Sequence, residues 1–96
     1  MKKHVSVAMN LGSAKSPLDF GHGCFAYKRD GLWRYKTIET KKRFGRRFLE
    51  VTDHDLIVEL EARGYQIVFP AHECVDRPDL PCPACERIVR HARRAR

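Results

Sequence analysis

The chain has 96 residues, of which 43% are hydrophobic and 32% charged, and its formal net charge is +7. This length fits a single domain, residues 1–96, whose small hydrophobic core needs a staple such as a metal ion or a disulfide. The sequence has no apolar run of about eighteen residues and no continuous hydrophobic signal region near its start, so we expect a cytoplasmic protein with no membrane partner.

The N-terminal half of the chain carries the patterns of β-strands. Hydrophobic residues alternate with smaller or polar ones over residues 4–11, which indicates a strand. A loop rich in Gly and Ser follows. Residues 24–38 then predict a hairpin with Asp30 and Gly31 in its turn, because Asp-Gly favours a tight chain reversal.

The register of this hairpin decides which side chains share a face of the sheet. A two-residue loop pairs Arg29 with Leu32, whereas a three-residue loop with Gly31 in a bulge pairs Lys28 with Leu32. We predict the three-residue loop because it separates aromatic residues from cations, and we expect the aromatic face to pack in the core. One face then carries Phe25, Tyr27, Trp33, Tyr35 and Thr37, and the other carries Ala26, Lys28, Leu32, Arg34 and Lys36.

The middle of the chain predicts a loop followed by a helix. Residues 40–49 are strongly basic and form a loop leading into a short strand, because Gly45 disfavours a long helix. A helix over residues 53–63 follows, since Thr52 is a good N-cap and two Asp residues occupy the first turn. Gly64 ends this helix.

The C-terminal part predicts one more strand, over residues 65–69, and a second helix over about residues 83–95. Between them lies a segment rich in Cys and Pro, and residues 70–96 combine this segment with the basic C-terminal helix. The predicted fold class is therefore α+β: an antiparallel sheet of about four strands, two helices and a zinc-clipped C-terminal segment.

Residues 72–85, HECVDRPDLPCPAC, contain three of the four cysteines of the chain. In a reducing cytoplasm, clustered cysteines bind metal or do redox chemistry more often than they form disulfides. A CxxC pair places two thiolates in one turn, where both can reach a tetrahedral ion. We therefore predict a structural Zn²⁺ site in which His72, Cys74, Cys82 and Cys85 clip a strand end to a helix start; His91, His22 and Cys24 are rival fourth ligands.

Other interpretations of this stretch fit less well. A zinc deaminase needs its catalytic Glu two positions after the metal-binding His, and here Glu73 is one place early. A thioredoxin-like redox protein carries a whole α/β domain behind its CxxC, and only eleven residues follow Cys85. Reduced cysteines without a metal remain a further alternative.

Charge is unevenly distributed along the chain. Residues 28–48 contain nine Lys or Arg against two acidic residues, and residues 50–80 contain eight acidic residues against two Arg. Residues 86–96 contain five Arg against one Glu. The dense cations of the first segment, followed by an Arg-rich end, favour an anionic partner.

The leading hypothesis is a non-enzymatic, zinc-stabilised module that binds DNA or RNA through backbone phosphates. No Ser/His/Asp arrangement, phosphate-binding glycine loop or spaced carboxylate pair supports catalysis. The residues predicted to contact phosphates are Lys28, Arg34, Lys36, Lys41, Lys42, Arg43, Arg46, Arg47, Arg87, Arg90 and Arg94.

A second hypothesis is a protein–protein effector that docks on a host nucleic-acid-handling complex, such as RNA polymerase or a nuclease complex. The acidic segment over residues 50–80 would repel a duplex but suit a basic partner. In type, the chain resembles the small accessory proteins of phages and mobile elements. A thiol redox protein built on the CxxC is the third hypothesis, and the sequence leaves the oligomeric state open.

Overall fold

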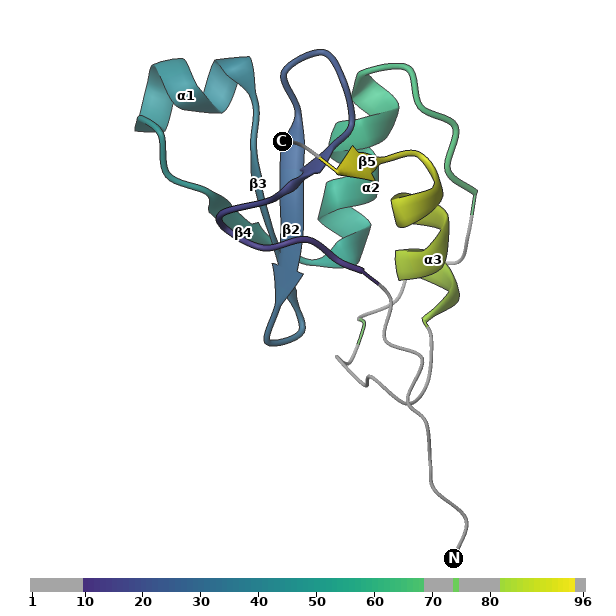
Figure 1. Ribbon diagram of the computed structural model, residues 1–96. Coiled ribbons are helices and arrows are strands. Elements are labelled where there is room, and N and C mark those ends of the chain that lie inside the picture. The colour runs from purple at the N-terminus through teal and green to yellow at the C-terminus, as the bar shows by residue number, and fades with distance from the viewer. Residues whose placement is uncertain (1–9, 69–73, 75–81, 95–96) are drawn as a thin grey trace, which may run out of the picture.

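Five antiparallel strands and three helices make up the part of the chain that the structure, a computed structural model, describes: residues 10–68, 74 and 82–94 (Figure 1). The strands are ordered β4-β3-β2-β1-β5 in one sheet. This arrangement confirms the predicted α+β class. The elements are β1 (Leu18–Asp19), β2 (Phe25–Arg29), β3 (Leu32–Lys36), α1 (Ile38–Phe44), β4 (Leu49–Val51), α2 (Asp53–Ala62), α3 (Pro83–Arg90) and β5 (Arg93–Arg94).

The hairpin of β2 and β3 forms as predicted, but the predicted three-residue loop is wrong. Arg29 pairs with Leu32, and Asp30 and Gly31 have φ values of 54° and 78°. Positive φ at both central residues belongs to a two-residue turn whose twist matches that of the strands. The outer face of the pair therefore carries Phe25, Tyr27, Arg34 and Lys36, and the inner face carries Ala26, Lys28, Trp33 and Tyr35.

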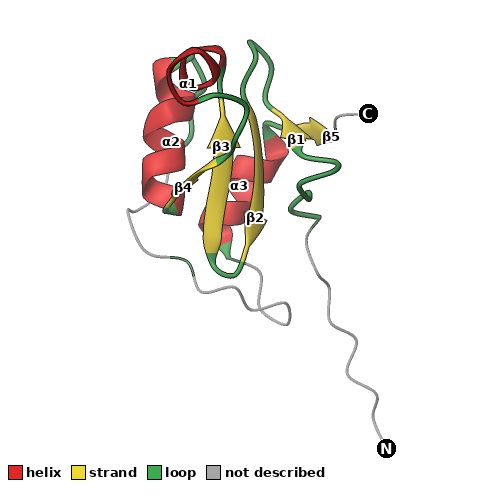
Figure 2. Cartoon of the chain, turned by 90° about the vertical axis from the view of Figure 1, so that its left-hand side faces the viewer, coloured by secondary structure: helices red, strands yellow, loops and turns green. Residues whose placement is uncertain are grey.

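The hydrophobic core lies between the inner face of the sheet and helices α2 and α3, which cover the same side of it (Figure 2). Trp33 and Tyr35 are buried there as expected. Tyr27 is also buried, but on the outer face, where its ring meets that of Phe48 edge-on with centroids 4.9 Å apart. Helices α2 and α3 contribute Leu56, Ile57, Leu60, Cys85 and Ile88 to the core.

Helix α1 replaces the loop that the sequence predicted over residues 40–44. Thr37 caps it: the Thr37 side chain accepts a hydrogen bond from the Thr40 backbone at 3.1 Å, and the Thr40 hydroxyl accepts one from the Thr37 backbone at 2.8 Å. This reciprocal pair satisfies two backbone donors at the helix start. The helix ends at Gly45, whose φ of 82° disfavours other residues, so the expectation that Gly45 prevents a long helix is confirmed.

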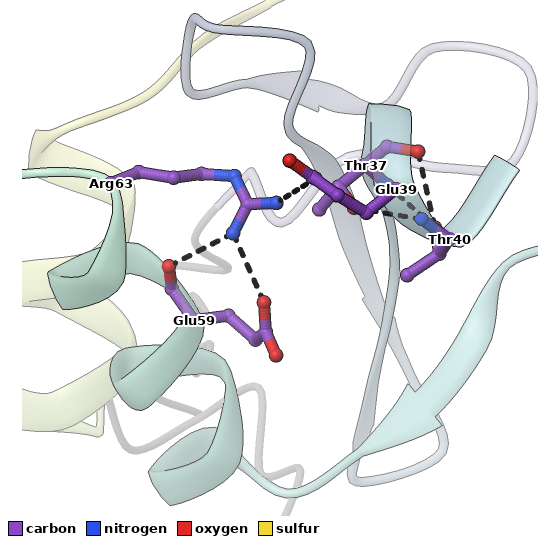
Figure 3. A network of polar contacts seen from close by, with 5 residues as sticks. All are labelled: Thr37, Glu39, Thr40, Glu59 and Arg63. Carbon is purple, nitrogen blue, oxygen red and sulfur yellow. Dashed lines mark hydrogen bonds and ion pairs between the residues drawn. The ribbon is translucent and has the colours of Figure 1, made fainter. Parts of the chain in front are cut away.

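Arg63 connects α1 to the end of α2 (Figure 3). Its guanidinium binds the Glu39 carboxylate of α1 at 2.8 Å and the Glu59 carboxylate of α2 at 3.0 Å. It also donates to the Glu59 backbone carbonyl at 3.1 Å. Helix α1 buries none of its own residues, so these polar contacts and its cap help to position it.

The remaining predicted elements are partly confirmed. Helix α2 begins after Thr52, whose side chain accepts from the Asp55 backbone at 3.2 Å, as expected. The strand predicted over residues 65–69 is wrong for residues 65–68, and residues 10 and 11 of the strand predicted over residues 4–11 are irregular. The rest of both segments lies outside the described residues.

The second predicted helix is shorter than expected. Helix α3 stops at Arg90, and the chain turns to form β5, which pairs with β1 at the edge of the sheet. Two backbone hydrogen bonds of the i to i−3 type, from His91 and Ala92, close this last turn. Within the described residues, no helix has the length and apolar character needed to cross a membrane.

Candidate metal centre

The three clustered cysteines come together at the start of α3. Cys82 is the N-cap of this helix and Cys85 lies in its first turn, so the CxxC spacing places both side chains on one side. Pro83 occupies the first turn as predicted, where its fixed φ suits a helix start. Cys74 approaches from the preceding segment, and the three Sγ atoms lie within 4.8 Å of one another.

Lys28 of β2 reaches this cluster from the inner face of the sheet. Its side chain is buried, with 6% of the residue exposed. Its Nζ donates to Cys85 Sγ at 3.0 Å and to Cys74 Sγ, and these two sulfur atoms lie 3.3 Å apart. The prediction of Lys28 as an exposed cation is therefore wrong, because the true hairpin register turns its side chain inward.

Cys74 is fixed through its backbone as well as its thiol. Its backbone N–H donates to Asp53 Oδ1 at 3.0 Å, and Asp53 is the first residue of α2, buried to 2% exposure. A carboxylate at a helix start is favoured by the helix dipole. The cluster thus joins the start of α2, the start of α3 and the end of β2.

Burial and hydrogen bonding shift the pKa values of the cluster in opposite directions. Burial raises the pKa of the Cys85 thiol to about 12, although the hydrogen bond from Lys28 lowers it. Burial raises the pKa of Cys74 in the same way. Burial lowers the pKa of Lys28, but its hydrogen bonds to Cys74 and Cys85 outweigh this and leave the pKa above its ordinary value. A redox CxxC needs an activated thiolate of lowered pKa, and neither Cys85 nor Cys74 has one.

The spacing of the sulfur atoms fits a tetrahedral metal ion. A Zn²⁺ ion binds each sulfur at about 2.3 Å, which places two sulfur ligands about 3.8 Å apart. The Sγ atoms of Cys74 and Cys85 lie 3.3 Å apart, and all three Sγ atoms lie within 4.8 Å of one another. Small side-chain rotations therefore suffice for three cysteines to share one ion, while Lys28, which donates through an ammonium, is a neighbour and not a ligand.

The rival fourth ligands do not join this group. Among the described residues, Cys74, Cys82 and Cys85 are the potential ligands that come together. Cys24 is fully buried elsewhere in the core, His22 is exposed, and His91 is exposed at the end of α3, where its ring lies edge-on to Tyr65. His72 lies outside the described residues and stays a prediction.

Most of the cations predicted to contact phosphates lie on the surface. Five of them belong to α1 and the short segment after it, and every residue from 41 to 47 is exposed. Among the ion pairs of the described residues, none involves these five side chains. They are Lys41, Lys42, Arg43, Arg46 and Arg47.

The cations of β3 have intramolecular partners. The Arg34 guanidinium binds the Glu50 carboxylate at 2.8 Å, and only 18% of the Arg34 side chain is exposed. The Lys36 ammonium lies 4.7 Å from the centroid of the Phe48 ring, in a cation–π contact. Both side chains remain on the outer face, beside the exposed cations of α1.

The C-terminal cations are spread over two elements instead of one helix. Arg87 and Arg90 are exposed on α3, and Arg90 pairs loosely with Glu86 at 3.6 Å. Arg94 lies in β5, and its side chain is outside the described part. The single Arg stripe predicted along one long helix is therefore wrong, because the helix ends at Arg90.

The acidic segment is partly neutralised within the fold. Asp53 is buried, while Glu50 and Glu59 pair with Arg34 and Arg63. Its described portion therefore presents less negative charge to a partner than the sequence suggested.

Sequence reasoning missed the role of Lys28. The signal that could have found it is the two-residue Asp-Gly loop, because that register sets Lys28 opposite the buried Trp33.

No protein-family model matches the chain, and comparisons with curated proteins and with solved structures give no match.

Proposed function

We propose that the chain is a small, non-enzymatic module that binds nucleic-acid phosphates through the exposed cations of α1 and the segment after it, and that a Zn²⁺ ion stabilises its fold. The observation that carries this proposal is the run of five exposed cations over residues 41–47, with no ion pair to any described acidic side chain. Unpaired surface cations at this density attract polyanions.

The cysteine cluster supports a structural role for the metal. Cys74, Cys82 and Cys85 would hold the ion, and a soft thiolate set favours zinc over magnesium or calcium. A bound Zn²⁺ supplies a fixed tetrahedral link between chain segments. Three thiolates, one divalent ion and a neutral fourth ligand sum to one negative charge, which the buried Lys28 ammonium balances.

Metal analysis of the purified protein, combined with thiol titration, tests the zinc part of this proposal. We expect one zinc per chain and cysteines that react only after chelation. A chelator, or Cys82→Ser, should lower the free energy of unfolding of the chain. A metal-free protein that stays folded and gains disulfide-reductase activity dependent on Cys82 would support the thiol redox alternative instead.

Salt-dependent binding tests the nucleic-acid part. Each phosphate contact contributes about 0.9 to the slope of log K against log salt for duplex DNA, and about 0.7 for a single strand. The double variant Lys41→Gln/Arg46→Gln should weaken binding and lower this slope by roughly 1.4 to 1.8. The matched control, Lys15→Gln/Arg29→Gln, removes the same charge from exposed sites outside α1 and should change the slope less. Affinity that barely varies with salt would contradict the proposal.

A protein partner is the alternative function. Helix α1 buries none of its residues and exposes the apolar side chains of Ile38 and Phe44, at 53% and 45%. Such side chains are common at protein interfaces. A specific complex with a nucleic-acid-handling protein that survives nuclease treatment, together with failure to bind plain DNA and RNA, would favour this function.

A further inference from the structure

The outer face of the sheet is not covered by α2 or α3 (Figure 2). A hollow of about 350 Å³ lies on this face beside α1. Phe25 of β2 and Ile38 of α1 provide its apolar surface. Three cations line it as well, one each from β3, α1 and the segment after α1: Lys36, Lys41 and Arg46. Among the residues that the structure describes, no acidic side chain lines this hollow.

The hollow is formed by close packing at its base. Gly23, with a φ of 76°, lies against Ile38 so closely that a Cβ atom at this glycine would sit 2.6 Å from Ile38 Cγ1. The glycine lets α1 approach the sheet, and the Ile38 side chain remains 53% exposed above it. The apolar surface of the hollow therefore results from the packing of α1 against the sheet.

A second hollow of about 410 Å³ lies next to the first on the same face. Phe48 and Tyr27 line it, together with Arg34, Arg47 and Glu50, and the Glu50 carboxylate pairs with Arg34, which leaves Arg47 as the cation without an ion pair among the described residues. The contact of Lys36 with the Phe48 ring separates the two hollows, and the consecutive residues Arg46 and Arg47 each line one of them. The outer face therefore alternates aromatic surface with positive charge over two adjacent sites.

We propose that this face binds single-stranded nucleic acid, with one base against Phe25 in the first hollow and the next nucleotide beside Phe48 in the second. Aromatic rings that stack unpaired bases and cations that follow the backbone are the two components of single-strand recognition. In a duplex the base faces are hidden, so Phe25 could contact only backbone. This inference rests on the proposed phosphate-binding function and specifies its ligand.

Binding of matched probes to the zinc-loaded full chain tests the inference. Three labelled oligonucleotides of about ten nucleotides are compared by fluorescence anisotropy: oligo(dT), oligo(U) and an abasic strand of equal charge. We expect oligo(dT) or oligo(U) to bind at least about fivefold more tightly than the abasic strand, which is the lower end of what one stacked base contributes. This comparison uses the unmodified protein and does not depend on any variant folding.

The variant Phe25→Val keeps a residue that favours a strand and removes the ring. It should weaken binding of oligo(dT) more than binding of the abasic strand, and so bring the two affinities close together. The control variant Phe44→Leu removes an exposed ring of α1 that lines a different hollow, between α1 and α2. It should leave the ratio of the oligo(dT) and abasic affinities intact.

The outcomes separate the two proposals. Equal affinity of the unmodified protein for abasic and base-carrying strands, or tighter binding to a duplex of the same length, would overturn the single-strand inference and leave phosphate binding standing. If none of the probes bound in a salt-dependent manner, both the single-strand inference and the proposed phosphate binding would be overturned.

Discussion

Replacing Lys28 with methionine tests how the buried lysine serves the cysteine cluster. Methionine keeps an unbranched side chain of similar length and removes the charge. In the zinc-loaded site, the change leaves one uncompensated negative charge and removes N–H donors to Cys74 and Cys85. Loss of an outer-shell partner typically weakens metal binding by about 10- to 100-fold, which corresponds to about 1.4 to 2.8 kcal/mol.

The metal-free protein should lose stability as well. The hydrogen bonds of Lys28 to Cys74 and Cys85 outweigh its desolvation and hold the pKa of Lys28 above its ordinary value, so Lys28 stabilises the fold at neutral pH. Lys28→Met removes these bonds and should therefore lower the free energy of unfolding of the metal-free chain.

Competition with a chromophoric chelator measures the zinc affinity, and urea unfolding of the metal-free chain measures the stability. Lys15→Met, at an exposed position, removes the same charge and should affect neither. Unchanged or tighter zinc binding by Lys28→Met would refute the reasoning, because it would mean that Lys28 competes with the ion for the thiolates.

Three further changes probe other parts of the fold. Burial raises the pKa of Cys24 from 9.0 to about 11, so the contribution of this thiol to stability is complete below pH 9 and declines by up to about 2–3 kcal/mol as pH rises to 11. In urea unfolding, the free energy of unfolding of Cys24→Ala should therefore fall less between pH 9 and pH 11 than that of the unmodified chain. Gly23→Ala should destabilise the protein by about 1–3 kcal/mol more than Gly45→Ala, because a Cβ atom clashes with Ile38 at the first site and meets nothing within 4 Å at the second. Both glycines have positive φ, so the backbone strain is matched. Equal shifts in the thermal midpoint would show that the structure relaxes to relieve the clash. Arg63→Gln breaks the ion pair with Glu39 that links α2 to α1, as well as the pair with Glu59 at the end of α2, and should cost about 1 kcal/mol, with faster amide exchange in α1. Unchanged exchange in α1 would mean that its cap and its packing against Gly23 suffice to position it.

Features determined by neighbouring residues could be predicted from the sequence. The start and end of α2 follow from Thr52 and Gly64, because caps act within a few residues. The association of Cys82 and Cys85 follows from their spacing in one turn, and the turn at Asp30 follows from its Asp-Gly pair.

Features determined by distant contacts could not be predicted in this way. Lys28 resembles any surface cation in sequence, and its partners lie 46 and 57 residues further along the chain. Helix α1 has no apolar stripe of its own, and Arg63, 24 residues from Glu39, helps to place it. The segment over residues 65–68 has the composition of a strand, but no neighbouring strand is available to it, and Ile67 packs into the core without one.

The two-residue strand β5 protects the edge of the sheet. Leu18 and Asp19 of β1 pair with it on the side away from β2, so their outward backbone groups are hydrogen-bonded within the chain. Because β5 directly follows α3, the clip that fixes the start of α3 also determines whether this cover stays in place. Loss of the ion would release α3 and β5 together and uncover an edge that can pair with another molecule. We therefore expect loss of the proposed Zn²⁺ ion to appear first as aggregation, before the sheet itself unfolds.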